Sequence, residues 1–341
     1  MSANEVSVIV FNAQYFSGPE VNDHKILMPV DKDQQIERIR KFADLCYEKD
    51  PDTILGNEFQ ENSSPTHDLN QADFLKEELK ARGLGDYEVI RMGGFNFEES
   101  ESPLIWRMAR WTYNNDYVRE NFLIKRLGFG KVEIPSEKLG PVRLHTSDVI
   151  LTRYPYSEQN HQYFFPTPPT KLQFYFDFVT QKDEREGITS CIIHHPAFDF
   201  IFHGLHLPYS NRPNREKQAE KVSEIVDDYL EVYPDLPQII AGDFNSAPEG
   251  LQKNFRLDRK VDALERIVRH PALHCHPDIY PRNDYVPPPH LHATYPSLAP
   301  EKTIDAVLLR NDLYFTHYEV CRLGISDHEP VYVKIAKRNS L

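Results

Sequence analysis

The sequence has no apolar run that approaches about 18 uninterrupted residues, so it contains no predicted transmembrane helix. It is also poor in glycine, with 14 glycines in 341 residues, and it shows no internal repeat. Hydrophobic residues make up 40% of the chain and charged residues 27%. This composition is typical of a globular protein and excludes a disordered or collagen-like chain.

Cysteine is scarce as well: the 4 cysteines are spread along the chain and form no Cys-x-x-Cys pair. This spacing argues against a disulfide scaffold. The first residues, Met1–Val6, contain neither the basic segment nor the long apolar segment of a secretory signal. We therefore expect reduced thiols and a cytoplasmic location.

Positively charged residues are fewer than negatively charged ones. The chain has 39 Lys and Arg residues and 52 Asp and Glu residues, which gives a net charge of −13. The chain therefore lacks the overall positive field that favours non-specific nucleic-acid binding. A local basic groove or a bound cation can still reverse the sign of the potential at one site.

Short β-branched runs and amphipathic helical patterns are mixed along the whole chain. Helices are predicted over Asp33–Tyr47 and Ala72–Ala81, and a long one runs through Ala219–Leu230 with Pro213 near its first turn. The predicted strands are Val6–Phe11, Thr53–Leu55, Val149–Leu151, Ser190–Ile193, Phe198–Leu205, Gln238–Ala241, Ala306–Leu309 and Val331–Ile335. Adjacent strands around a turn, as in 190–205, predict antiparallel neighbours. This favours an α/β protein built as a two-sheet β-sandwich flanked by helices over a doubly wound parallel sheet.

Two proline clusters, Pro166–Pro169 and Pro287–Pro289, have strand-like apolar runs on either side. We interpret them as surface loops and not as interdomain linkers. The prediction is a single domain over residues 1–341.

Polar and acidic residues flank many of the predicted strands. Each of them alone is unremarkable, but strand ends gather along one rim of a sheet, so together they could line one cleft. These residues are Asn12, Glu58, His206, Asp243, Asn245, Asp305, Asp327 and His328.

Several segments occur in the order seen in the endonuclease/exonuclease/phosphatase superfamily, which the chain resembles from Val8 to Ile335. The segments are Phe11–Asn12, Pro51–Glu58, Ser147–Pro155, Gly204–Leu207, Arg215–Gln218, Gly242–Ser246, Thr294–Ser297, Thr303–Asp305 and Ser326–Pro330. The sequence Gly-Asp-Phe-Asn at 242–245 is the most diagnostic of them. The resemblance implies a DNase I-like, four-layer fold and a hydrolase of phosphate esters.

Two positions depart from the superfamily pattern. Asn57 stands before the metal-binding Glu where Gln is usual, and Gln14 stands where the AP-endonuclease branch has Asp. The second departure weakens an assignment to that branch.

The predicted metal ligands follow from the chemistry of phosphate-ester hydrolysis, which needs a cation to neutralise developing charge. Mg²⁺ takes few protein carboxylates and keeps waters. Glu58 suits the first ligand, Asn12 is a neutral partner beside it, and Asp327 adds a further metal contact. We expect Mg²⁺, with Mn²⁺ as an alternative.

The other predicted catalytic residues act on water and on the phosphoryl group. Asp243 orients the attacking water or accepts its proton, and Asn245 donates a hydrogen bond to a phosphoryl oxygen. His206 and His328 contact non-bridging oxygens or shuttle a proton, and Asp305 holds His328. The sequence leaves open whether Asp243 or His328 is the general base.

A group of histidines suggests zinc as an alternative metal. The group consists of His270, His274, His276, His290 and His292. Its spacing matches no standard zinc finger, and a proline-rich loop with incidental histidines is the simpler interpretation.

The long stretch between Glu58 and Val149 predicts an insertion at about 93–146. Its aromatic and basic residues Trp106, Arg107, Arg110 and Trp111 could bind substrate by stacking or at a lipid headgroup. A helical lid that packs its tryptophans inward explains the same residues.

The functional prediction is a divalent-metal-dependent phosphodiesterase. Its substrate could be a nucleic acid, a lipid headgroup or a small phosphorylated metabolite, because one fold serves many substrates. The alternatives are a nuclease that acts on DNA or RNA and a catalytically silent binding module. No protein partner and no oligomeric state can be deduced.

Overall fold

The computed structural model describes residues 4–19, 31–63, 67–98, 143–163, 187–207, 212–246, 263–277, 292–300 and 302–338. They form two mixed six-stranded sheets. Sheet A has the order β11 (Leu313–Val320), β12 (Val331–Lys337), β1 (Glu5–Asn12), β2 (Thr53–Gln60), β4 (Arg143–Thr152) and β3 (Glu88–Glu98). Sheet B has the order β5 (Tyr156–Tyr163), β6 (Gly187–Ile193), β7 (Phe200–His206), β8 (Gln238–Asp243), β10 (Asp305–Arg310) and β9 (Leu273–Cys275).

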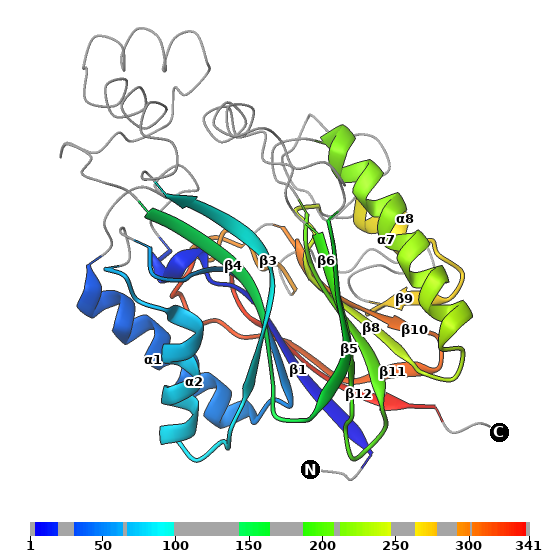
Figure 1. The fold of residues 1–341 in the computed structure, drawn as a ribbon, viewed down its shortest axis with the longest axis horizontal. Coiled ribbons are helices and arrows are strands. Elements are labelled where there is room, and N and C mark those ends of the chain that lie inside the picture. Colours follow the sequence, from blue (N-terminus) through cyan, green and yellow to red (C-terminus); the bar gives the residue numbers. More distant parts are fainter. Residues whose placement is uncertain are drawn as a thin grey trace, which may run out of the picture.

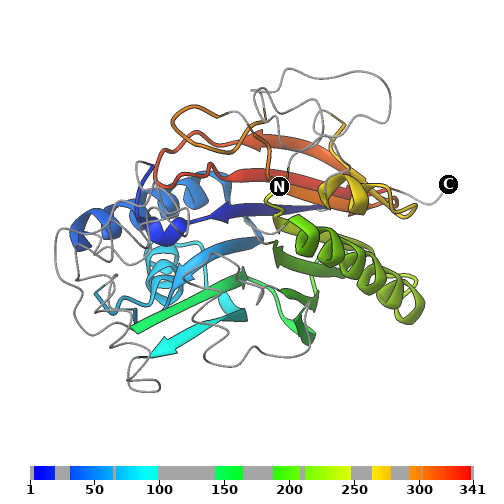
Figure 2. The ribbon, with the colours of Figure 1, turned by 90° about the horizontal axis from the view of Figure 1, so that it is seen from above.

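Helices cover the outer faces of both sheets. The helices α1 (Lys32–Lys49) and α2 (Gln71–Ala81) lie against sheet A, and α7 (Arg212–Val232) and α8 (Ala263–Val268) lie against sheet B (Figures 1 and 2). The result is a helix–sheet–sheet–helix sandwich, so the predicted fold class is confirmed. The predicted helices agree with α1, α2 and α7 to within a few residues, and Pro213 lies in the first turn of α7 as predicted.

Three apolar layers hold the sandwich together. One lies between the sheets and includes Val8, Leu55 and Phe202, and the other two lie beneath the helices. A strand such as β1, which is buried on both faces, therefore has a continuous apolar sequence instead of an alternating one.

Two β-α-β units position the strand ends that matter for function. Helix α1 connects β1 to the parallel strand β2, and α7 connects β7 to the parallel strand β8. Because parallel neighbours end at the same edge, each unit brings two carboxyl ends together. The pairing is in register at Asn12 with Asn57 and at His206 with Asp243.

The bounds of the predicted insertion, residues 93 and 146, fall within β3 and β4, which pair with each other. Residues 99–142 lie outside the described residues, so the insertion stays a prediction. Trp106, Arg107, Arg110 and Trp111 are therefore also outside them. All four cysteines are buried and free. Within the described ranges, no helix has the length and apolarity needed to cross a membrane.

Candidate active site

The side chain of Asn12 connects the two sheets at the carboxyl ends of their central strands. Its Nδ2 donates to Glu58 Oε1 at 3.1 Å and to Asp243 Oδ2 at 3.0 Å. Its Oδ1 accepts from the backbone N–H of Gln14 at 3.0 Å, which fixes the orientation of the amide. Asn12 and Asp243 are both 1% exposed, so these hydrogen bonds are protected from water.

Asp243, Asp305 and His328 form a buried cluster beside Asn12. Asp305 lies opposite Asp243 in the antiparallel pair of β10 and β8. Its Oδ2 is 2.8 Å from His328 Nδ1, and the other ring nitrogen, Nε2, lies 3.8 Å from Asp243 Oδ2. One ligand atom from each of the three residues falls within 4.8 Å of the other two. Five segments far apart in the sequence thus converge on one point.

Burial and mutual repulsion shift the protonation of this cluster. Burial and the Asp305 carboxylate raise the pKa of Asp243 to about 6, although His328, His206 and Asn12 oppose the shift. Burial disfavours the charged form of His328, but the carboxylates of Asp305, Asp327 and Asp243 outweigh burial and raise its pKa well above the usual value. Near neutral pH, the imidazolium of His328 therefore faces an ionised Asp243.

His206 and Asn245 form the side of the site that belongs to β7 and β8. Asn245 Nδ2 lies 3.3 Å from His206 Nε2 and donates to the carbonyl of Leu207 at 2.8 Å. Asn245 has a left-handed backbone with φ 47° and donates its N–H to Asp243 Oδ1 at 2.7 Å. The same His206 nitrogen is 3.7 Å from Glu58 Oε1, so His206 lies against Glu58 as well.

Asp148 belongs to this constellation, although the sequence analysis did not select it. Its Oδ1 accepts from the N–H of Glu58 at 2.9 Å and lies 3.7 Å from His206 Nδ1. Glu58 itself has a left-handed backbone with φ 56°, so this hydrogen bond holds a strained residue. One feature of the sequence could have identified it. Asp148 is two positions before Ile150, so both side chains lie on the face of β4 that packs between the sheets.

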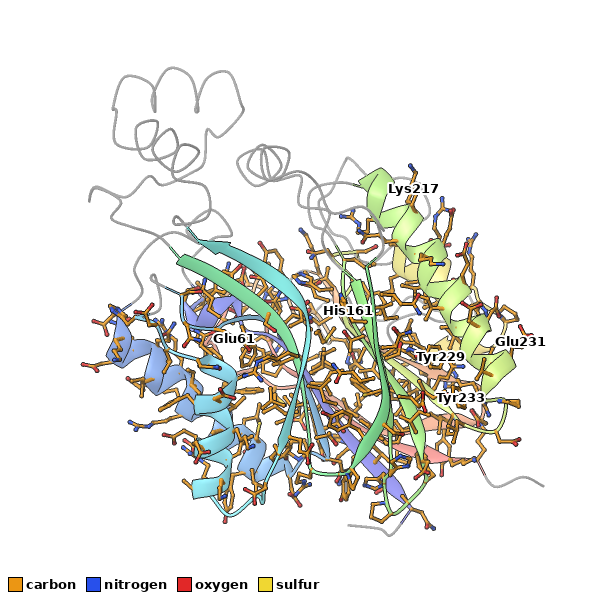
Figure 3. All side chains as sticks on the ribbon, in the orientation of Figure 1. Glu61, His161, Lys217, Tyr229, Glu231 and Tyr233 are labelled. Carbon is orange, nitrogen blue, oxygen red and sulfur yellow. The ribbon has the colours of Figure 1, made fainter. Side chains whose placement is uncertain are left out.

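His161 of β5 is a second neighbour that the sequence did not suggest. Burial lowers its pKa, and the charge of Asp148 acts in the opposite direction. Its Nδ1 is 2.7 Å from Thr189 Oγ1. Figure 3 shows His161 on β5 near the space between the two sheets.

The two departures from the superfamily pattern both have local explanations. Asn57 is fully buried, donates to the carbonyl of Leu205 at 3.2 Å and accepts from the N–H of Asp243 at 3.2 Å. Asn57 therefore ties β2 to sheet B. The Oε1 of Gln14 accepts from Ser17 at 3.2 Å, so the contribution of Gln14 to Asn12 comes from its backbone.

The segment before β12 places Asp327 and His328. Ser326 Oγ donates to the carbonyl of Asn12 at 2.8 Å and lies 3.2 Å from the N–H of His328. Asp327 Oδ1 is 3.9 Å from His328 Nε2, and the ring of Tyr295 packs on His328 with centroids 4.9 Å apart. All eight residues predicted from strand ends therefore lie in or against one site.

The donor set fits a divalent cation. Burial and repulsion from Asp305 together raise the pKa of Asp243, and a bound cation would stabilise the ionised carboxylates against both effects. Asp305 Oδ1 is buried and has no hydrogen-bond partner among the described residues. Over the described ranges, the group that brings three ligand atoms together is Asp243, Asp305 and His328. The predicted ligands Asn12, Glu58 and Asp327 border this group, and their role as ligands stays a prediction.

In the part of the chain that the structure describes, the alternative zinc site has two neighbouring histidines, His276 and His292, and no third ligand beside them. His276 and His292 have ring centroids 5.5 Å apart, and both pack on Tyr318. No group of three ligand atoms forms there among the described residues. His290 lies outside them.

Comparisons with known proteins agree with this geometry. Residues 9–328 match the sequence pattern of the Endonuclease/Exonuclease/phosphatase family. A protein of that description from Beutenbergia cavernae DSM 12333 superposes with a TM-score of 0.60 at 14% identity, over 98% of this chain and 72% of the other. A mannosyl-6-phosphatase from Bacteroides thetaiotaomicron VPI-5482 has a TM-score of 0.57 at 16% identity, over 97% and 99%.

TDP2 from Caenorhabditis elegans is a third structural neighbour. Its TM-score is 0.55 at 12% identity, over 97% of this chain and 74% of the other. No curated protein matches the sequence significantly. At these identities, the structural neighbours establish the fold.

Proposed function

The chain belongs to the endonuclease/exonuclease/phosphatase family, and we propose that it is a divalent-metal-dependent phosphodiesterase. The observation that carries the proposal is the buried cluster of Asn12, Asp243, Asp305 and His328. A buried acid with a pKa of about 6 beside a histidine whose pKa is raised is a pair suited to acid–base chemistry. The intact set of polar side chains argues against a silent binding module.

The proposed ligands of the cation are Glu58 and Asn12, with Asp327 as a further contact. The bound cation would neutralise charge that develops on the phosphoryl group. The hydrogen bond from Asn12 Nδ2 to Glu58 Oε1 holds this carboxylate in place.

The remaining residues are proposed to act either on the attacking water or on the phosphoryl group. Asp243 is ionised above about pH 6 and is the proposed base that orients water and accepts its proton. His328 is protonated and is the proposed donor to a non-bridging oxygen, with Asp305 orienting its ring. His206 and Asn245 donate hydrogen bonds to the same group as charge builds.

The experiment is a substrate panel with Mg²⁺, Mn²⁺ or EDTA. The panel contains plasmid DNA, single-stranded oligonucleotides, choline phospholipids, inositol phosphates and a sugar 6-phosphate at matched phosphate concentration. The mannosyl-6-phosphatase neighbour is the reason to include a monoester. Fastest turnover of a diester supports the proposal, and fastest turnover of a monoester would replace it with a phosphatase.

The first prediction is that Glu58→Gln lowers the turnover number by about 100-fold or more, because a neutral amide holds a cation weakly. Glu61→Gln is the matched control. Glu61, labelled in Figure 3, directly follows β2, and its side chain pairs with Arg91 at 2.7 Å. Full activity of the wild-type enzyme in EDTA, or an equal loss in both variants, would contradict the metal mechanism.

A further inference from the structure

Directly after Asn12, the backbone makes a turn of unusual conformation. Gln14, Tyr15 and Phe16 have φ angles of 39°, 58° and 53°, so three consecutive residues other than glycine are left-handed. Each such residue costs of order 1 kcal/mol and persists only where its surroundings hold it. Because the N–H of Gln14 binds Asn12 Oδ1, this turn orients the Asn12 amide.

Side chains from two helices hold the turn. The carbonyl of Tyr15 accepts from Gln35 Nε2 at 2.9 Å and from Gln71 Nε2 at 2.8 Å. The guanidinium of Arg38 donates to the carbonyls of Phe16 at 3.1 Å and Ser17 at 2.7 Å. Gln35 and Arg38 come from α1, and Gln71 is the first residue of α2.

Gln71 differs from the other two because its amide also binds the strand that carries Glu58. Its Oε1 accepts from the N–H of Gln60 at 2.7 Å. Gln60 lies two residues beyond Glu58, just after the register shift between Gly56 and Phe59 in the pairing of β2 with β4. One fully buried amide thus connects the turn after Asn12 to the strand after Glu58.

We propose that Gln71 is a positioning residue that sets the separation of Asn12 and Glu58 and thereby tunes the affinity of the site for a divalent cation. The inference rests on the proposed function, since it takes Glu58 as a ligand of the cation and Asn12 Nδ2 as the group that orients it. The hydrogen bonds of Gln71 go to backbone groups two or three residues away from these two residues, so it acts in the way that outer-shell hydrogen bonds orient metal ligands elsewhere.

Loss of the Gln71 amide would affect the strand β2 more than the turn after Asn12. Without Gln71, the carbonyl of Tyr15 keeps its hydrogen bond from Gln35, but the N–H of Gln60 loses the side-chain oxygen that accepts from it. The strand beyond Glu58 is then free to relax its strained backbone. Glu58 Oε1 and Asn12 Nδ2, now 3.1 Å apart, would no longer be held together from both sides.

The test is Mn²⁺ binding to the folded protein, measured by calorimetry or by electron paramagnetic resonance without any substrate. The variant is Gln71→Met, which keeps the volume of the side chain and removes both hydrogen bonds. Gln238→Met is the matched control. Gln238 is also fully buried, lies 3.1 Å from His203 Nε2 and donates to the carbonyl of Val226 at 3.3 Å, away from the site.

Both variants should lower the melting temperature by a similar amount, because each orphans buried polar groups. Gln71→Met alone should raise the dissociation constant for Mn²⁺, by about tenfold. An unchanged dissociation constant in Gln71→Met, or an equal rise in Gln238→Met, would overturn the inference while leaving the metal site intact. If the wild-type protein binds no Mn²⁺, the proposed metal site fails and the inference fails with it.

A second variant covers the case in which Gln71→Met does not fold. Gln35→Met removes one of the two donors to the Tyr15 carbonyl and leaves β2 untouched. It should raise the Mn²⁺ dissociation constant by about threefold, a smaller change than that of Gln71→Met because it loosens one side only. No change in this variant would show that the turn does not affect the metal site and would overturn the inference.

Discussion

Asp305 and His328 show how much of the proposed chemistry depends on single atoms. Asp305 Oδ2 lies 2.8 Å from His328 Nδ1, and Asp305 is fully buried. The carboxylate therefore selects which ring nitrogen carries a proton and stabilises the charged ring. A neutral amide at this position would keep the shape of the site but remove that charge.

The second prediction is that Asp305→Asn lowers the turnover number by about 10²–10⁴-fold, the range expected for the loss of an acid–base partner. The melting temperature should change far less, because the amide fills the same volume. Asp312→Asn is the control, since Asp312 binds Arg310 outside the site. Small and equal rate losses in Asp305→Asn and His328→Ala would mean that the pair is structural.

At the scale of elements, β8 and β7 must approach closely before Asp243 can reach Asn12. Gly242 has a φ of 153°, and a Cβ built on it would lie 1.9 Å from the carbonyl oxygen of Leu205. Backbone atoms cannot yield as a flexible side chain can. The glycine of the Gly-Asp-Phe-Asn segment therefore allows the strand pairing that places Asp243 beside His206.

The third prediction is that Gly242→Ala lowers the free energy of unfolding by about 3 kcal/mol or more, because the methyl group forces the two strands apart. The measurement is equilibrium unfolding in urea. Gly83→Ala is the matched control, since Gly83 also has a positive φ, 82°, but a Cβ there meets nothing within 4 Å. Equal destabilisation in both variants would assign the cost to backbone conformation instead of the clash.

Helix α7 covers a buried histidine on β7. His203 Nδ1 lies 2.7 Å from Ser190 Oγ and its Nε2 lies 3.1 Å from Gln238 Oε1. Tyr229 packs its ring edge-on against His203, and Figure 3 shows Tyr229 on the side of α7 toward sheet B, whereas Glu231 points away. Burial lowers the pKa of His203 from 6.5 to about 4, although the hydrogen bond to Gln238 opposes the shift.

The fourth prediction is that His203 makes the fold sensitive to acid. Above about pH 6.5 the ring is neutral in both the folded and the unfolded chain, so it causes no pH dependence. Between pH 6.5 and 4 the unfolded chain binds a proton that the folded chain does not, which removes about 2–4 kcal/mol of stability. Urea unfolding of wild type and His203→Gln at pH 7.5 and 4.5 measures this. Equal losses on acidification would contradict the prediction.

Net charge is the property of the whole molecule that bears on substrate choice. With a net charge of −13, the body of the protein repels a long polyanion. Residues 101–153 contain 9 basic and 6 acidic residues, and most of this stretch lies outside the described residues. We therefore expect few Lys and Arg side chains to contact the phosphates of a bound nucleic acid.

The fifth prediction is a preference for a compact phosphoester, a short single strand or a lipid headgroup over long duplex DNA. The logarithm of any plasmid cleavage rate should fall with the logarithm of salt concentration at a slope of about −1 to −3, because few phosphates are contacted. Combined substitution of Arg107 and Arg110 by alanine should raise KM more than it lowers kcat. Fastest turnover on plasmid DNA with a steep salt slope would contradict this prediction.

The order of segments along the chain was sufficient to predict the family and the sandwich. The eight residues predicted from strand ends lie close together in the structure, and their roles stay predictions. The prediction of the fold and of this shared location succeeded because strand ends gather at one rim, and because apolar periodicity distinguishes buried strands from amphipathic helices. Asp148 was missed although it lies within the segment Ser147–Pro155, because a single acid inside a strand does not show by itself which side chains it meets. Gln71 was missed for a similar reason, as a glutamine at the start of a helix is ordinarily solvated.

The amino-acid sequence alone thus determined which residue types are available for the chemistry and in which layers the chain folds. Only the tertiary structure decided how those residues interact. The Asn12 amide bridges Glu58 and Asp243, which lie 46 and 231 positions away. The pKa of Asp243 is raised because folding buries its carboxyl group and places Asp305 beside it. The physical reason is that hydrogen bonds and buried charges act over a few ångströms in space, whereas sequence patterns report neighbours along the chain.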